Sequence, residues 1–202
     1  MIVFDMDGVL CRYRIERRLE RLAEWSGRSP AEIRQAIWGS GFEAEADRGL
    51  LSAEEYLRGF GERLGYPLSA SEWVEARRFA MEPDPEMLEL ARGLAGDGPV
   101  GMFTNNPLLL ERQLAEIFPA VVEIFGRRAI VSASLGRAKP DPEAYRRLAV
   151  RLDCSPTEIL YFDDRADFVT GARRAGLDAY QVRSAADVRA VLDRDAHRAA
   201  RG

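Results

Sequence analysis

The residues with the clearest chemical potential stand where predicted strands end. Asp5 follows the apolar run of residues 2–4, and Asp7 and Gly8 come directly behind it. A carboxylate at the end of a rigid strand can attack phosphorus and form a covalent aspartyl-phosphate. A second carboxyl group two residues later can protonate the leaving oxygen and then activate water, while the glycine lets the chain turn away. The segment predicts Asp5 as a nucleophile and Asp7 as a general acid and base.

Two further segments carry groups that suit an anion. Thr104 and Asn105 follow the apolar run Val100–Phe103, just before a predicted helix start. Lys139 lies shortly before a second helix start at Asp141. Helix N-termini favour anions, and a fixed ammonium group can clamp a phosphoryl group. Thr104, Asn105 and Lys139 are therefore the predicted phosphate-binding residues.

An acidic pair, Asp163 and Asp164, follows the apolar run of residues 159–162. Attack by one anion on another requires charge neutralisation, and clustered carboxylates are the hard oxygen ligands that Mg²⁺ prefers. Each signal alone has a bland explanation, such as a turn, a helix cap or a surface lysine. All four signals occur at predicted strand or loop ends in one short chain, which favours a single site that uses Asp5, Asp164 and Asp163 to bind Mg²⁺.

The hydrophobic pattern predicts how these residues come together. After residue 83, short apolar runs alternate with helical patterns, which is typical of an α/β fold with a parallel sheet flanked by helices. In such sheets the ligand site lies beyond the carboxyl ends of the strands.

Residues from about 12 to about 82 have a different character. They show helical patterns, with capping-box starts at Ser29, Ser52 and Ser69, and no convincing strand. We therefore expect residues 1–11 and 83–202 to form the catalytic core, and residues 12–82 to be an inserted helical domain.

Composition narrows the possible partners. The chain of 202 residues has 29 basic and 33 acidic residues mixed along it and a net charge of -4, without the basic footprint of a nucleic-acid binder. Its two cysteines do not have metal-ligand spacing. No secretion signal and no apolar run of roughly 20 residues is present. We expect a soluble, cytoplasmic monomer or homodimer with a small phosphorylated substrate and neither nucleic acid nor membrane as partner.

The same residues resemble the four motifs of the haloacid dehalogenase-like (HAD) hydrolase superfamily. The motifs are matched in order by Phe4-Asp5-Met6-Asp7-Gly8-Val9-Leu10, Phe103-Thr104-Asn105-Asn106, Ala138-Lys139-Pro140-Asp141 and Tyr161-Phe162-Asp163-Asp164. The match covers nearly the whole chain. The resemblance implies a Rossmann-like core with a small helical cap, and its layout is similar to sugar-phosphate phosphatases of the glucose-1-phosphatase kind.

The resemblance also implies a role for each matched residue. These roles are nucleophile for Asp5, acid and base for Asp7, phosphate binding for Thr104 and Lys139, and Mg²⁺ binding for Asp5, Asp163, Asp164 and the Asp7 carbonyl. One position departs from the family pattern, because Phe168 stands where an Asp or Asn is common. The neighbouring Asp167 is not an evident substitute.

Other functions remain open at this point. A phosphomutase shares every core residue, whereas a haloacid dehalogenase lacks the second aspartate and needs no metal, so Asp7 opposes that chemistry. A phospho-accepting receiver domain carries its acidic pair first in the chain, not last. A ligand-binding module without turnover is suggested only by Phe168.

Two features of the helical segment have open roles. The loop Trp38–Phe42 either closes over a substrate or packs its two rings inside the helical domain, and packing is the favoured interpretation. Arg12 either contacts an anionic substrate tail or lies on a solvated face.

Overall fold

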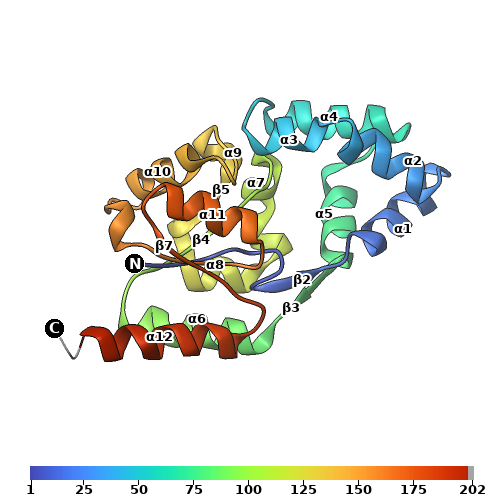
Figure 1. The fold of residues 1–202 in the computed structure, drawn as a ribbon. Helices are drawn as coiled ribbons and strands as arrows, with labels where there is room; N and C mark the ends of the chain where they lie inside the picture. Colours follow the sequence, from blue (N-terminus) through green and yellow to red (C-terminus); the bar gives the residue numbers. More distant parts are fainter. Residues whose placement is uncertain (200–202) are drawn as a thin grey trace.

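The structure is a computed structural model that describes residues 1–199, with side chains described through Arg194. It has a sheet with helices on both faces and a separate helical lobe, joined by a narrow two-stranded ribbon (Figure 1). No helix in the described part of the chain is both long enough and apolar enough to cross a membrane.

The main sheet is parallel and has the strand order β5-β4-β1-β6-β7. Its strands are β1 (Ile2–Phe4), β4 (Val100–Thr104), β5 (Ala129–Val131), β6 (Leu160–Asp163) and β7 (Asp178–Gln181). In the central strand, Phe4 is in register with Met102 and Phe162. The residues that follow β1, β4 and β6 therefore meet at one edge of the sheet. The predicted α/β fold with a parallel, helix-flanked sheet is confirmed.

Helices cover both faces of this sheet (Figure 1). They are α6 (Pro85–Asp97), α7 (Leu108–Ile117), α8 (Pro119–Phe125), α9 (Ser132–Leu135), α10 (Pro142–Arg151), α11 (Ala166–Arg174) and α12 (Ala185–Ala199), with 3₁₀ turns at Gly126–Arg128 and Pro156–Glu158. Successive strand residues point to opposite faces, so Val3 packs in the cluster that contains Tyr145 and Val169, and Phe4 packs in the cluster that contains Leu110. Burial on both faces explains why the strands are nearly uniformly apolar.

The helical lobe consists of five α-helices and a π-helical turn. They are α1 (Ile15–Ser26), α2 (Pro30–Arg34), the π turn (Gln35–Gly39), α3 (Phe42–Asp47), α4 (Ala53–Leu64) and α5 (Ala70–Phe79). The capping boxes predicted at Ser29, Ser52 and Ser69 are all formed. Inside the lobe, Phe42 stacks on Tyr56 with ring centroids 5.3 Å apart, and Trp38 meets Phe60 edge-on at 6.1 Å. The two rings of the Trp38–Phe42 loop therefore pack within the lobe.

A ribbon of β2 (Cys11–Tyr13) and β3 (Met81–Pro83) joins the lobe to the core. These antiparallel strands lie where the sequence pattern showed no convincing strand, because three residues each are too few to display an alternating pattern. The expected domain boundaries at residues 12 and 82 fall within this ribbon, and that division stays a prediction.

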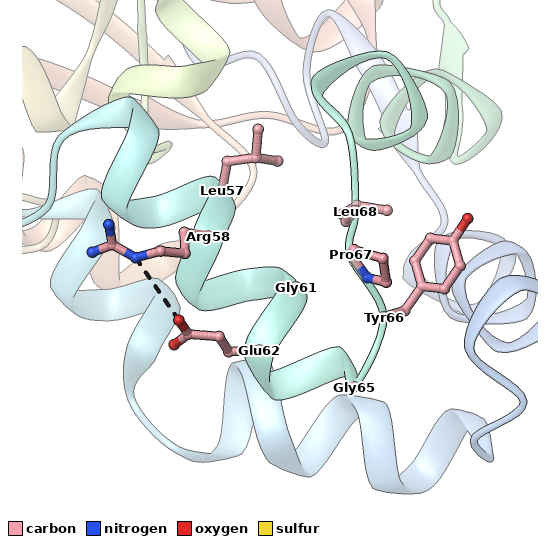
Figure 2. Close-up of a pocket in the computed structure, with 8 residues that line it drawn as sticks. All are labelled: Leu57, Arg58, Gly61, Glu62, Gly65, Tyr66, Pro67 and Leu68. Atoms are coloured by element: carbon pink, nitrogen blue, oxygen red, sulfur yellow. Dashed lines mark ion pairs between the residues drawn. The ribbon is translucent and has the colours of Figure 1, made fainter.

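A groove on the lobe surface lies beside α4 and the segment that follows it (Figure 2). It has a volume of about 470 Å³ and contains none of the predicted site residues. The chemistry must therefore be sought at the sheet edge instead.

Candidate active site

Lys139 is the centre of the cluster at the sheet edge. Its Nζ atom is fully buried and lies 2.8 Å from Asp5 Oδ1 and 2.8 Å from Asp163 Oδ2. It also donates to the Tyr161 hydroxyl at 2.8 Å and to the Phe103 carbonyl at 3.3 Å. Burial lowers the pKa of Lys139, but Asp5 and Asp163 raise it by more. The net shift is upward, so the ammonium stays charged. A fixed positive charge thus lies beside the predicted nucleophile.

Asn105 fixes the backbone of this lysine. Its side-chain Nδ2 donates to the Lys139 carbonyl at 2.9 Å, and its Oδ1 accepts from the Lys139 amide at 2.9 Å. Both polar groups of the Asn105 side chain are therefore engaged by the protein. A contact of Asn105 with a substrate would use its backbone N–H or the second hydrogen of Nδ2.

Asp5 is buried, with an exposed fraction of 4%. Burial raises its pKa to about 8, although Lys139 opposes the shift; Asp163 and Asp7 reinforce it. A nucleophile must be ionised, and a further cation at the site would favour the ionised form. Ionisation of Asp5 near neutral pH would therefore be favoured by a second positive charge in addition to Lys139.

The acidic pair divides into two roles. Asp163 Oδ2 accepts from Tyr161 at 2.5 Å and from Lys139, while Oδ1 accepts from the Arg165 amide at 2.9 Å. Asp164 Oδ1, in contrast, is buried and has no hydrogen-bond partner in the described structure. Ligand oxygens of Asp5, Asp163 and Asp164 lie within 4.8 Å of one another. An orphaned carboxylate oxygen within an all-oxygen donor set fits a hard divalent cation such as Mg²⁺.

Gly8 makes room for Asp164. A Cβ atom at Gly8 would lie 2.5 Å from the Asp164 carboxyl carbon, and the φ of Gly8 is +97°. Both the close approach and the backbone conformation exclude a side chain here. The glycine of the Asp-x-Asp-Gly pattern is thereby explained.

The carboxylate of Asp7 is held from two sides. Arg77, at the end of α5, donates from Nη2 to Asp7 Oδ2 at 2.5 Å, and Asn106 donates from Nδ2 to the same oxygen at 3.5 Å. Asn106 also donates to Thr104 Oγ1 at 2.8 Å, so the predicted residues Thr104 and Asp7 share one neighbour. The structure thus brings the predicted residues into one connected cluster.

Sequence reasoning missed three members of this cluster. Asn106 was present in the second motif, and Tyr161 lies two residues before Asp163, which places both side chains on the same strand face. These signals could have found them. Arg77 gives no such signal, because only the fold brings it to Asp7.

A cavity of about 390 Å³ opens onto the cluster. It is lined by Asp7, Gly8, Val9, Cys11, Arg12, Tyr13, Asp84, Asp164 and Arg183. Arg12 is exposed and lines this cavity, so it is solvated and also lies at the rim of the cluster.

The departing position, Phe168, also borders the site. Its ring centre lies 4.7 Å from Lys139 Nζ and 4.0 Å from Arg165 Cζ. Asp167 forms an ion pair with Arg165 at 2.6 Å and is half exposed. Asp167 thus binds Arg165 on the surface, and the aromatic ring of Phe168 contacts the lysine.

Comparison with known proteins agrees with this geometry. Residues 1–176 match the family model of the haloacid dehalogenase-like hydrolases. Phosphatase MT3486 of Mycobacterium tuberculosis is 32% identical over 221 residues, which cover 96% of this chain and 92% of the relative. D-ribitol-5-phosphate phosphatase of Bacteroides thetaiotaomicron is 25% identical over 197 residues and covers 95% of both chains.

A solved structure shares the fold. A HAD family enzyme of Bacteroides thetaiotaomicron, in complex with magnesium and inorganic phosphate, superimposes with a TM-score of 0.74 at 20% identity over 89% of this chain and 92% of that one. The chain belongs to the haloacid dehalogenase-like hydrolase family, among its phosphoric monoester hydrolases.

Proposed function

We propose that this enzyme is a Mg²⁺-dependent phosphatase that removes the phosphoryl group from a small phosphorylated metabolite through a covalent phospho-Asp5. The observation that carries the proposal is the position of buried Asp5, whose Oδ1 lies 2.8 Å from Lys139 Nζ, beside the orphaned oxygen of Asp164. These contacts support a role for Asp5 as nucleophile beside a fixed ammonium group, with an unpartnered carboxylate oxygen that suits a metal ion.

In the first step, a carboxylate oxygen of Asp5 attacks phosphorus and the bond from phosphorus to the leaving oxygen breaks. Asp7 gives its proton to that oxygen, so the leaving group departs as an alcohol. In the second step, a water molecule attacks the phosphorus of phospho-Asp5. Asp7 takes the proton from this water, and inorganic phosphate is released with Asp5 restored.

The other residues of the cluster hold the phosphoryl group. We infer that the Thr104 hydroxyl, the Asn105 backbone N–H and the Lys139 ammonium donate to the equatorial phosphoryl oxygens. Thr104 and Lys139 are buried, which keeps competing water away from these two donors.

We assign the Mg²⁺ ligands to Asp5, Asp164 and the backbone carbonyl of Asp7. The cation, when bound, supplies the positive charge that offsets the phosphoryl oxygens and favours ionised Asp5. Both Asp163 oxygens are engaged by protein donors. We infer that Asp163 positions Lys139 and the backbone of Arg165 beside the metal site, and that it can also contact the metal directly.

For the substrate, we propose a sugar or polyol phosphate. The support is the name of one relative, which acts on D-ribitol 5-phosphate, together with the resemblance of the layout to sugar-phosphate phosphatases. We further propose a cytoplasmic monomer or homodimer.

The proposal is tested by measuring inorganic phosphate release from a panel of sugar, polyol and nucleoside monophosphates, with Mg²⁺ or with a chelator. Wild type is compared with Asp5→Asn and with the control Asp97→Asn, an exposed aspartate at the end of α6. We expect release that requires both Mg²⁺ and Asp5 and that is unaffected by the control. Phosphoryl migration within the substrate without release would identify a mutase. Halide release from a 2-haloacid without metal would identify a dehalogenase.

A further inference from the structure

The end of α3 is docked against the catalytic core. Ser132 Oγ donates to the backbone carbonyl of Asp47 at 2.7 Å. Two residues later, Gly49 has a φ of +71°, and a Cβ atom there would lie only 2.2 Å from the Ala133 carbonyl oxygen. This contact admits only glycine and fixes Asp47 at the boundary between the lobe and the sheet edge.

The carboxylate of Asp47 has charged neighbours and no partner. Burial, reinforced by Glu43 and Asp7, raises the pKa of Asp47 well above its ordinary value, while Arg77 and Lys139 oppose the shift. Ser132 Oγ, which donates to the Asp47 carbonyl, also accepts from the Asn106 amide at 3.1 Å, and the Asn106 side chain donates to Asp7. This chain of hydrogen bonds places Asp47 beside Asp7. Among the described residues, the Asp47 side chain makes no hydrogen bond or ion pair.

Unused donors surround the same place. Arg77 is 2% exposed, and its Nε has no hydrogen-bond partner in the described structure, although its Nη2 binds Asp7. Arg18 is 4% exposed and likewise keeps unpartnered Nε and Nη2 atoms. It is an electrostatic neighbour of Glu43. Glu43 Oε1 accepts from the Tyr56 hydroxyl at 2.6 Å, which leaves Oε2 as its open acceptor. Buried donors without partners are uncommon in folded proteins, so the open guanidinium atoms beside the half-buried Asp47 carboxylate indicate a place for a bound ligand.

We propose that Asp47, Glu43 and Arg77 form the leaving-group site and bind the hydroxyl groups of a polyhydroxylated monophosphate. The inference rests on the proposed function and adds the residues that select the substrate. A hydroxyl group can donate to a carboxylate and accept from a guanidinium, so it satisfies both kinds of open group. No apolar group can do this.

The hydrogen-bonding groups of the site argue against an apolar leaving group. An apolar leaving group would desolvate the buried charges without replacing their hydrogen bonds. The site therefore favours a leaving group with several hydroxyl groups.

The test uses two substrates that differ in hydroxyl groups, D-ribitol 5-phosphate and phenyl phosphate. Because a hydrogen bond to a charged group contributes about 1.5–3 kcal/mol, Asp47→Ala should lower kcat/KM for the polyol phosphate about 10- to 100-fold. For phenyl phosphate the loss should stay below about threefold, because that substrate makes no such bond. Glu43→Gln is expected to show the same asymmetry, and Glu45→Gln, an exposed residue of the same helix, should change neither substrate.

Equal losses for the two substrates, in variants that keep the wild-type circular dichroism spectrum, would overturn the leaving-group site. If Asp47→Ala fails to fold, Glu43→Gln and Asp47→Asn decide by the same ratio of losses. Wild type that hydrolyses phenyl phosphate as efficiently as the polyol phosphate would also overturn it, while leaving the phosphatase intact. Wild type that releases phosphate from no compound would overturn the proposed function itself, and the leaving-group site with it.

Discussion

Arg77 and Asp7 are separated by 70 residues and are joined by a hydrogen bond of 2.5 Å between Arg77 Nη2 and Asp7 Oδ2. Arg77 comes from the helical lobe and Asp7 from the loop after the central strand. The contact ties the lobe directly to the predicted general acid and base. Its guanidinium also lies over the Tyr13 ring, 4.0 Å from the ring centre, which fixes it in place.

Replacing Arg77 should therefore disturb catalysis through Asp7. We expect Arg77→Met to lower kcat about 10- to 100-fold, because Asp7 loses the group that orients it. Arg77→Lys should recover part of the loss, since it keeps a positive charge but not the planar guanidinium geometry. The neighbouring exposed Arg78→Met is the control in steady-state kinetics. Wild-type kcat in Arg77→Met would contradict the positioning role.

Tyr161 should contribute to stability through two charged partners. Its hydroxyl donates to Asp163 and accepts from Lys139 inside a fully buried cluster. Tyr161→Phe keeps the ring and removes both bonds, so we expect a loss of about 1–3 kcal/mol in the free energy of unfolding. Urea denaturation measures it, with Tyr66→Phe as the comparison because its hydroxyl binds Glu72 in the lobe, away from the buried cluster. Equal stability of Tyr161→Phe and wild type would show that the bonds contribute nothing net.

The elevated pKa of Asp5 predicts how stability depends on pH. Burial raises this pKa to about 8 from 3.8, so the folded protein keeps a proton that the unfolded chain releases. The stabilising contribution is fully present below about pH 4 and is lost as pH rises through about 8. In chelator, the wild-type Tm should fall from about pH 5 to about pH 9 more steeply than that of Asp5→Asn, which cannot ionise. Parallel pH profiles in a thermal-shift series would refute this origin.

Gly8 should be required for the metal site. Gly8→Ala would place a Cβ atom 2.5 Å from the Asp164 carboxyl carbon. We expect weaker Mg²⁺ binding by calorimetry and a loss of activity of about 100-fold or more, because the ligand must move. Gly27→Ala is the matched control, since Gly27 also has a positive φ of +70° but no atom within 4 Å of an added Cβ. Equal Mg²⁺ affinities of Gly8→Ala and Gly27→Ala would contradict a displacement of Asp164.

Much of the fold could be predicted because its signals are local. Short apolar runs alternate with helix starts, and the capping boxes at Ser29, Ser52 and Ser69 mark helices that the structure contains. The connecting ribbon could not be predicted. Its three-residue strands carry no periodic pattern, and their pairing depends on residues about 70 positions apart.

The site divides in the same way. Asp5, Lys139 and Asp164 stand at strand or loop ends, where chain position alone predicts that they meet. The contacts of Arg77 and Asp47 depend on how the lobe packs against the core, which no local pattern encodes. The division of labour between Asp163 and Asp164 also required the structure. It depends on which oxygen atoms find protein donors.

The most direct test of the account is to trap the phosphoryl group on Asp5. In Asp7→Asn, para-nitrophenyl phosphate can still react because its leaving group needs no proton, whereas hydrolysis of the intermediate lacks its base. Rapid quenching and peptide mass spectrometry should then find one phosphoryl group on the peptide that contains Asp5, formed together with a burst of nitrophenol. Suppose that Asp7→Asn gives no burst and an unmodified Asp5 peptide, while the wild-type enzyme releases phosphate. That result would contradict covalent catalysis by Asp5.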